Sequence, residues 1–239
     1  MRIRIFSVAA VVALGAVSAA LAQPRNMNLT INTADGSSWN WQNAGQPGNW
    51  IQDSTNPNQW SISGNVSRPS YDFGFNLTLD PDPFIANSFT ITNPSAITQT
   101  YTVVVTLPIA PVVPFPSQTL GGVSGTLVDF NGSGDAQIAT AGPGTAIYTA
   151  LIDGADYQQL LPHSFSFNTP SFLPDPFGPS VFGPLSGQPG AFLSIGIRNT
   201  FTLSPGDSVG LTSTFLLVPT PGAMGLLALG GLVATRRRR

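Results

Sequence analysis

The sequence predicts an all-β protein, and three observations lead to that prediction. Apolar residues alternate with polar or small residues over several stretches, and this period of two is typical of half-buried strands. Clusters of Pro, Gly, Asn and Asp, such as DPDPF, NGSGD and SPGD, separate these stretches and indicate turns. No stretch with a helical period of useful length remains outside the two termini. We therefore expect a single β-sandwich of Ig-like or jelly-roll type.

The alternation is clearest in three stretches. Phe and Leu alternate with Gly, Asn and Thr over residues 73–79, and Tyr, Val and Leu alternate with Thr and Val over residues 101–107. Ala, Leu and Ile alternate with Phe, Ser and Gly over residues 191–197. Each pattern predicts a strand with one face in a core. Residues 89–108 and 201–217, in which a turn separates two apolar runs, resemble paired strands of Ig-like bacterial surface domains.

Charge is scarce and unevenly placed. Only 8% of the residues are charged, the positive ones are all Arg, and the negative ones are all Asp. Between the termini, the three residues Arg25, Arg68 and Arg198 stand against eleven Asp, which gives a formal net charge of −8. Three scattered arginines cannot form the basic face that binds phosphates, so we expect no nucleic-acid partner. The absence of Cys excludes disulfides, thiolate metal sites and Cys nucleophiles.

The N-terminus has the parts of a secretory signal peptide. The basic segment MRIR is followed by an apolar run, and the run ends in a small-x-small cleavage site, Ala20-Leu21-Ala22. We therefore expect a signal helix over residues 1–22, export, and a mature chain that begins at Gln23. The alternative is a membrane anchor that the protein retains, because the apolar run is close to the length that spans a bilayer.

The C-terminus combines an apolar run with a basic cluster. Residues 223–234 are uncharged and mostly apolar, but this run is shorter than the ~20 residues of a membrane-spanning helix. Residues 215–218 would add length, although Pro219 and Pro221 interrupt the run. An apolar segment followed by a basic cluster halts export with its charges on the cytoplasmic side. We therefore expect a short C-terminal apolar helix, oriented by the last four residues, Arg236, Arg237, Arg238 and Arg239.

A short motif precedes the apolar run and the arginines. It consists of Val218, Pro219, Thr220, Pro221 and Gly222. The order of motif, apolar run and arginines resembles the PEP-CTERM sorting signal of exported bacterial proteins. The resemblance implies that the tail lies transiently in the inner membrane of a Gram-negative bacterium that makes exopolysaccharide, where an exosortase-like membrane peptidase cuts it near the Pro-x-Pro motif. Thr220 stands where the family has Glu, which leaves the cognate peptidase open, and the alternative is a plain membrane anchor.

Catalytic chemistry has little support in the sequence. His163 is the single histidine, and no Gly-x-Ser-x-Gly motif accompanies it. Because the chain has no Glu, a glycosidase would need two aspartates. Asp72 combined with Asp80, Asp82 or Asp175 gives no distinctive pair. We therefore expect no catalytic residues, no enzymatic activity and no cofactor, and we expect His163 to be exposed or to lie at the edge of a strand.

One loop resembles half of a cation site. Asp129, Asn131 and Ser133 recur at every second position, and alternate oxygens of this kind converge on Ca²⁺ in metal-binding loops. Asp135 would add a carboxylate, but the twelfth position is Thr140 in place of the closing acidic residue. We favour the alternative, a polar Asn-Gly hairpin turn without a metal.

The four tryptophans fall within one short segment. Trp39, Trp41, Trp50 and Trp60 are surrounded by Asn, Gln, Asp and Ser. This combination suits carbohydrate binding, because an indole face covers the apolar face of a sugar while amides and carboxylates meet its hydroxyls. Trp39 and Trp41 would share one face of an extended segment. The alternative, which we favour, is that the rings fill the core or cap an open end of the sandwich.

The predicted organisation is a signal peptide over residues 1–22, a β-sandwich domain over residues 23–217 and a sorting tail over residues 218–239. From it we expect an exported protein of the cell surface or extracellular matrix. Its role would be that of a structural or interaction component of an exopolysaccharide envelope, such as a biofilm matrix. The alternative is a carbohydrate-binding module that uses the four tryptophans and has polysaccharide as its partner, and a hydrolase is the third candidate.

Overall fold

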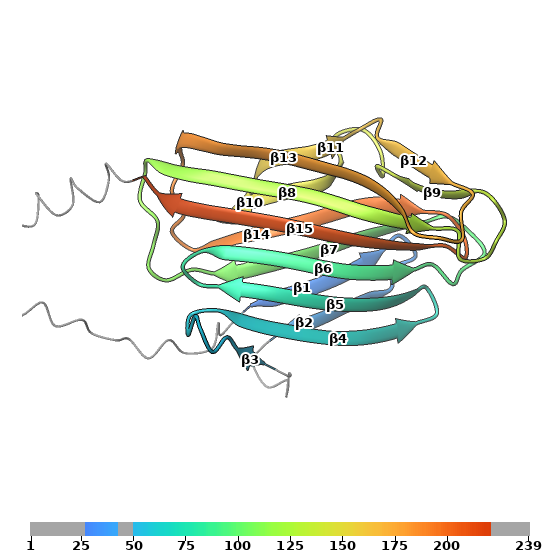
Figure 1. Cartoon of the computed structure of the whole chain (residues 1–239), viewed down its shortest axis with the longest axis horizontal. Coiled ribbons are helices and arrows are strands. Elements are labelled where there is room, and N and C mark those ends of the chain that lie inside the picture. Colours follow the sequence, from blue (N-terminus) through green and yellow to red (C-terminus); the bar gives the residue numbers. More distant parts are fainter. Residues whose placement is uncertain (1–26, 43–49, 221–239) are drawn as a thin grey trace, which may run out of the picture.

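The computed structural model describes residues 27–42 and 50–220. Within these residues the chain forms fifteen strands in two antiparallel sheets and no helix (Figure 1). The all-β class is therefore confirmed. The predicted signal helix and C-terminal helix lie outside the described residues. None of the described segments is a helix with the length and hydropathy needed to cross a membrane.

Sheet A has eight strands. Six of them lie side by side in the order β11-β10-β14-β7-β1-β2, and β9 pairs with both β14 and β12. The bounds of these strands are β1 (Asn28–Thr33), β2 (Ser38–Gln42), β7 (Gln99–Pro108), β9 (Ala136–Ala139), β10 (Ala146–Ile152), β11 (Ala155–Pro162), β12 (Ser166–Thr169) and β14 (Ser194–Leu203).

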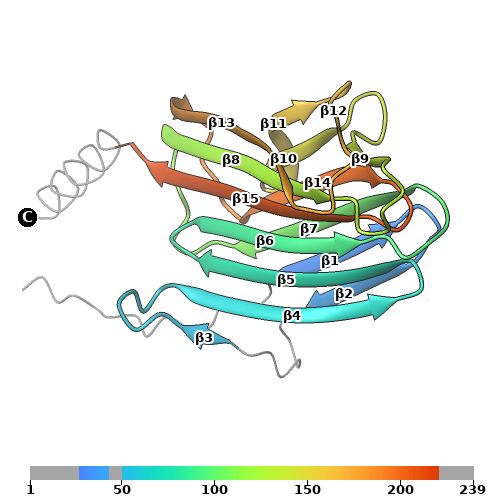
Figure 2. The ribbon, with the colours of Figure 1, turned by 45° about the vertical axis from the view of Figure 1, so that its right-hand side comes forward.

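Sheet B has seven strands in the order β13-β8-β15-β6-β5-β4-β3. It faces sheet A, as the turned view in Figure 2 shows. The bounds of these strands are β3 (Ile51–Gln52), β4 (Trp60–Arg68), β5 (Tyr71–Asp80), β6 (Phe84–Thr92), β8 (Ser117–Val128), β13 (Asp175–Gln188) and β15 (Ser208–Pro219).

One apolar core lies between the two sheets. Every second residue of β5 and β7 is buried, from Tyr71 to Leu79 and from Gln99 to Leu107. Phe89 of sheet B stacks on Phe201 of sheet A with 6.3 Å between the ring centres. Burying a side chain of this size contributes about 1.5–3 kcal/mol, so the alternation in the sequence accounts for the packing of the two sheets.

The three alternating stretches have different outcomes. Residues 73–79 and 101–107 lie within β5 and β7, as predicted. The prediction for residues 191–197 is wrong at its start, because β14 begins only at Ser194 and the Leu193 side chain is 70% exposed. The backbone there leaves the regular ladder because the Asp153 carboxylate accepts hydrogen bonds from the N–H groups of Phe192, Leu193 and Ser194.

Residues 89–108 and 201–217, which the sequence predicts to pair, form strand pairs in both sheets. Residues 89–108 contain the end of β6, a crossing between the sheets, and β7, while residues 201–217 contain the end of β14, a second crossing, and β15. Strand β6 pairs with β15, and β7 pairs with β14. The two crossings therefore stack on each other, and the predicted pairing is confirmed.

Asn93 ties the two crossings together. It is fully buried, and its side-chain amide donates to the carbonyl oxygens of Ile97, Leu203 and Ser204 at 2.9 to 3.0 Å. Its backbone N–H donates to the Asp207 carbonyl, and its own carbonyl accepts the N–H of Gly206. Buried backbone groups that leave a sheet need such partners, and Asn93 supplies them to both crossings.

Replacing Asn93 with Ala is expected to lower the free energy of unfolding by about 2–4 kcal/mol, because three buried carbonyl oxygens lose their donor. Chemical denaturation measures the change. Asn65→Ala is the matched control, since Asn65 is exposed on β4, and it should alter stability by less than about 0.5 kcal/mol. Equal effects of the two substitutions would show that Asn93 does not hold the crossings together.

Candidate functional site

The four tryptophans close one edge of the molecule between the two sheets. Trp39 and Trp41 lie on the inward face of β2, where the Trp39 ring is 5.8 Å from the ring of Phe75 in β5. The rings of Trp41 and Trp50 are 5.6 Å apart, and those of Trp50 and Trp60 are 6.1 Å apart. Trp41 belongs to the apolar core and is only 6% exposed, Trp39 and Trp50 pack against the core, and Trp60 contacts the ring of Trp50.

This packing favours the capping interpretation over a sugar platform. A sugar platform needs a free indole face, whereas here each indole packs against another aromatic ring in a tilted or edge-on arrangement. The indole N–H groups of Trp50 and Trp60 are buried and have no hydrogen-bond partner among residues 27–42 and 50–220. Among the described residues, the contacts that hold the cluster are therefore those of ring packing.

The Asp129 loop satisfies its own oxygens. The Asp129 side chain is buried, and its carboxylate accepts the backbone N–H groups of Gly132, Ser133 and Gly134 at 2.7 to 3.1 Å. Asn131 accepts the Ser133 N–H and donates to the Pro205 carbonyl, and the Ser133 hydroxyl donates to Asp135. Over residues 27–42 and 50–220, no three His, Cys, Asp or Glu residues converge as a metal site would require.

The loop is a polar turn, but the expected hairpin is wrong. A hairpin joins neighbouring strands of one sheet, whereas this loop leads from β8 in sheet B to β9 in sheet A. Backbone N–H groups in this loop have no partner in either sheet and need another acceptor. The Asp129 carboxylate accepts three of them, and this allows the chain to cross from one sheet to the other.

A second buried carboxylate lies near this loop. Burial raises the pKa of Asp207, and the charges of Asp129 and Asp135 raise it further, although a hydrogen bond from the Ser204 hydroxyl opposes them. One carboxylate oxygen of Asp207 has no hydrogen-bond partner within the described part of the chain. Ionisation of Asp207 therefore costs stability at neutral pH, because its raised pKa favours the protonated carboxyl in the native state.

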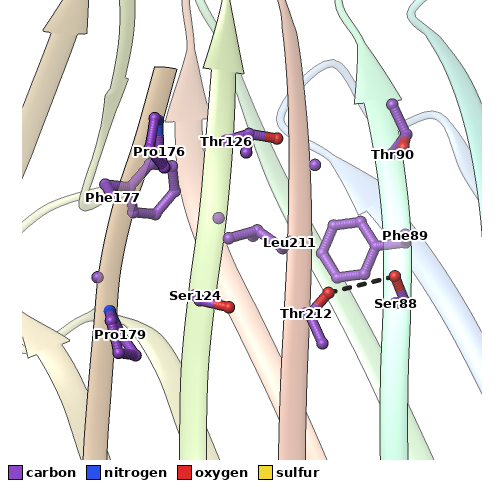
Figure 3. Close-up of a pocket in the computed structure, with 13 residues that line it drawn as sticks. Ser88, Phe89, Thr90, Ser124, Thr126, Pro176, Phe177, Pro179, Leu211 and Thr212 are labelled. Atoms are coloured by element: carbon purple, nitrogen blue, oxygen red, sulfur yellow. Dashed lines mark hydrogen bonds between the residues drawn. The ribbon is translucent and has the colours of Figure 1, made fainter. Parts of the chain in front are cut away.

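The outer face of sheet B carries a shallow groove of about 450 Å³. Hydroxyl groups from three strands line it, and prolines of β13 form one wall (Figure 3). The Ser88 and Thr212 hydroxyls lie 3.3 Å apart across β6 and β15. The hydroxyl-bearing residues are Ser88, Thr90, Ser124, Thr126 and Thr212.

A second hollow of about 450 Å³ adjoins the first at Thr90. Asp72 is the one titratable side chain that lines either hollow, and it accepts a hydrogen bond from the Ser67 hydroxyl. General acid-base catalysis on a sugar requires two carboxylates at close range. These hollows offer hydroxyl groups for hydrogen bonding and no such pair.

The residues considered for catalysis lie apart. His163 is exposed in the turn between β11 and β12, as expected. Asp72 and Asp80 lie at opposite ends of β5, which for eight residues of strand is about 27 Å. Asp82 is exposed in the turn before β6, and Asp175 begins β13. The structure brings none of them to His163 through a hydrogen bond or an ion pair between described residues.

The beginning of the expected sorting motif belongs to the folded body. Val218 and Pro219 are the last residues of β15, where they pair with Gln118 and Ser117. Thr220 donates both its N–H and its hydroxyl to the Pro116 carbonyl, at 3.3 and 3.0 Å. Residues 215–218 lie in β15 between β6 and β8, so they cannot extend an apolar helix in the folded protein.

The rest of the expected sorting signal, which consists of Pro221, Gly222 and the four terminal arginines, lies outside the described residues. Sequence reasoning also missed a set of exposed apolar residues beside Thr220. The prolines of the segment PIAPVVPFPS indicate a turn cluster, and its Val and Phe residues are the signal that would have identified an exposed apolar surface.

Comparison of the chain with protein-family models gives no match, and comparison with curated proteins gives none either.

EDTA is expected to leave the midpoint of thermal unfolding unchanged, because the Asp129 carboxylate is occupied by backbone N–H groups and not by a metal. Asp129→Asn should lower the free energy of unfolding by about 1–3 kcal/mol, since an amide cannot accept all three hydrogen bonds. Asp135→Asn is the control, because Asp135 is exposed. A loss of stability in EDTA that added Ca²⁺ restores would contradict this account.

Proposed function

We propose that the chain is an exported protein of the cell surface or extracellular matrix, sorted by its C-terminal tail, that acts as a structural or interaction component of an exopolysaccharide envelope. The observation that carries the proposal is the direct continuation of β15 into the Val218–Gly222 motif. Strand β15 ends at Pro219, Thr220 is fastened to Pro116, and the apolar run of the tail begins at Ala223. A sorting tail needs such an attachment to a folded cargo.

The position of the two ends of the body supports the proposal. Asn28 of β1 pairs with Thr106 near the end of β7, and Pro219 of β15 pairs with Ser117 at the start of β8. The loop from β7 to β8 joins these places, so Met27 and Thr220 lie at the same end of the molecule (Figure 1). An exported chain with a signal peptide at one terminus and a membrane-held tail at the other would present both to one membrane surface.

The surface chemistry of the body suits a hydrated matrix. The outer face of sheet B presents uncharged Ser and Thr hydroxyls in its groove, and the body has few charges. Hydroxyl groups exchange hydrogen bonds with water and with polysaccharide alike. The crossings between sheets are compatible with the proposed Ig-like or jelly-roll type within the two-sheet class.

The other two candidate functions have less support. A carbohydrate-binding module based on the tryptophans would need free indole faces, and these rings pack against one another and against Phe75. A hydrolase would need a pair of catalytic groups, and the two hollows on sheet B hold one carboxylate. We therefore propose that the protein is not an enzyme.

The pairing of the end of β15 bears on where a sorting peptidase would cut. Peptidases bind their substrates as extended, accessible chain, and cutting between Val218 and Thr220 would require the end of β15 to separate from β8. We propose that the exosortase-like peptidase cuts after Thr220, and that Thr220, with two hydrogen bonds to Pro116, marks the boundary of the cargo.

Cell fractionation of the native host tests the proposal. Replacing the four terminal arginines with Lys should preserve membrane retention and sorting, because each basic residue contributes on the order of 1 kcal/mol of attraction to the cytoplasmic membrane surface. Replacing them with Ser should release uncleaved protein outward. Replacing Pro219 and Pro221 with Ala should keep the protein in the membrane, because the processing motif is lost.

Arg68→Ser is the control for the loss of a basic residue. Arg68 is exposed at the end of β4, and this variant should fractionate like the wild type. If the wild-type protein keeps its tail and the proline variant fractionates identically, the tail is a plain anchor and the sorting proposal is wrong.

A further inference from the structure

Four large apolar side chains are exposed at the end of the molecule where the tail begins. Val112 and Phe115 lie in the loop between β7 and β8, and they are 51% and 69% exposed. Phe192 and Leu193 lie just before β14, and they are 64% and 70% exposed. Soluble proteins rarely gather such side chains without an interaction partner.

These four residues are held in a fixed arrangement by backbone contacts. Val113 and Ala191 exchange two hydrogen bonds of 2.9 Å, and the Ile109 N–H donates to the Leu193 carbonyl at 3.2 Å. The Val113 and Ala191 side chains are buried. The two loops therefore form one unit. The buried Val113 and Ala191 side chains anchor it, and the four large apolar side chains beside them remain exposed.

Asp153 fixes the outer half of this unit. Its carboxylate accepts the N–H groups of Phe192, Leu193 and Ser194 at 2.8 to 3.1 Å. Three successive N–H groups bound to one carboxylate make a tight turn. The result is that Phe192 and Leu193 stand out from the molecule on an ordered backbone.

The start of the tail lies beside this unit. Thr220 is bonded to the carbonyl of Pro116, which follows Phe115 in the chain. The apolar run begins at Ala223, three residues further on, and three residues of extended chain span at most about 11 Å. A membrane that receives the apolar run must therefore come close to Val112, Phe115, Phe192 and Leu193.

We propose that these four residues form a membrane-contact surface, which enters the boundary between the headgroups and the acyl chains of the bilayer that holds the tail. This inference rests on the proposed function, because the tail must first lie in a membrane. Phe and Leu side chains favour that boundary, and the contact would orient the body with the chain after Thr220 facing the membrane.

The charges near the surface indicate what kind of lipid contact this is. Exposed Asp82 lies in the neighbouring turn, where the Ala110 N–H donates to the Pro81 carbonyl. Of the arginines in the described part of the chain, Arg68 lies in the β4–β5 turn at the other end, and Arg198 pairs with Asp156 within sheet A. The described residues therefore supply no basic side chain to this surface, and the contact made by its four apolar side chains should be insensitive to salt.

The chain provides a matched control for this surface. Phe172 and Leu173 are also adjacent and are 68% and 75% exposed. They lie at the opposite end of the molecule, since Ser171 accepts the N–H of Asp129 directly after β8 ends. Both pairs have the same residue types and similar exposure, and they differ in their distance from the tail.

The test places a fluorescent label at one end or the other of the full-length chain. Because the protein has no Cys, Leu193→Cys and Leu173→Cys each accept one environment-sensitive label at an exposed position. The labelled proteins are mixed with vesicles of phosphatidylethanolamine and phosphatidylglycerol, with and without nitroxide-bearing lipids. Sedimentation of the same samples measures the bound fraction.

On bound protein, the label at residue 193 should shift to the blue and be quenched by the nitroxide lipids at least threefold more than the label at residue 173. Raising NaCl to about 0.5 M should leave the difference intact. Equal emission and quenching of the two labels on protein that sediments would overturn the membrane-contact surface and leave the tail anchor standing.

Two other outcomes would also overturn the membrane-contact surface. If the full-length protein does not sediment with vesicles, the tail does not hold a membrane, and the proposed function fails together with this inference. If the label at residue 193 shifts without vesicles and in proportion to protein concentration, the surface binds a second copy of the chain, and the membrane assignment is wrong.

Discussion

The fold depends on the place where the chain crosses twice between the two sheets. At each crossing the backbone leaves the sheets and needs new hydrogen-bond partners in a buried site, and Asn93 supplies them to both crossings at once. This allows β6 to pair with β15 and β7 with β14, with Phe89 stacked on Phe201 between them. Because β15 is then fixed between β6 and β8 as far as Leu216, and on β8 as far as Pro219, the point at which the tail leaves the body is fixed as well.

The sequence was sufficient for the elements whose alternation of apolar and polar residues is regular. It predicted β5, β7 and the pairing of the two crossing segments. A regular alternation of apolar and polar residues predicts a strand that turns its apolar face toward the core between the two sheets. It was insufficient where a carboxylate reorganises the backbone. Asp153 draws residues 192–193 out of a strand pattern, and the Asp129 loop, which resembles a hairpin in the sequence, crosses between the sheets. It also gave no signal for β13, whose prolines and glycines are tolerated because it pairs on one side only, with irregular register.

The sequence identified the residues of the candidate sites, but it did not predict how their side chains pack. The sequence pointed to both the Trp cluster and the Asp129 loop. In the structure the indole rings pack against other aromatic rings, which favours the capping interpretation, and backbone N–H groups bind the Asp129 carboxylate in a polar turn that crosses between the sheets instead of forming a hairpin. The exposed residues Phe192 and Leu193 were invisible in the sequence, since their pattern is that of a strand. Their position beside Thr220 follows from pairing between distant segments. One end of the molecule thus combines an ordered apolar surface with the start of the tail.

The central claim is that the body is a cargo whose boundary with its sorting tail lies at Thr220. Mass spectrometry of the mature protein, isolated from the surface or medium of its native host, tests this claim most directly because it determines both termini at once. The account predicts an N-terminus at Gln23 and a C-terminus between Thr220 and Ala223. A surface protein that retains Arg239, or one that ends before Pro219, would contradict it.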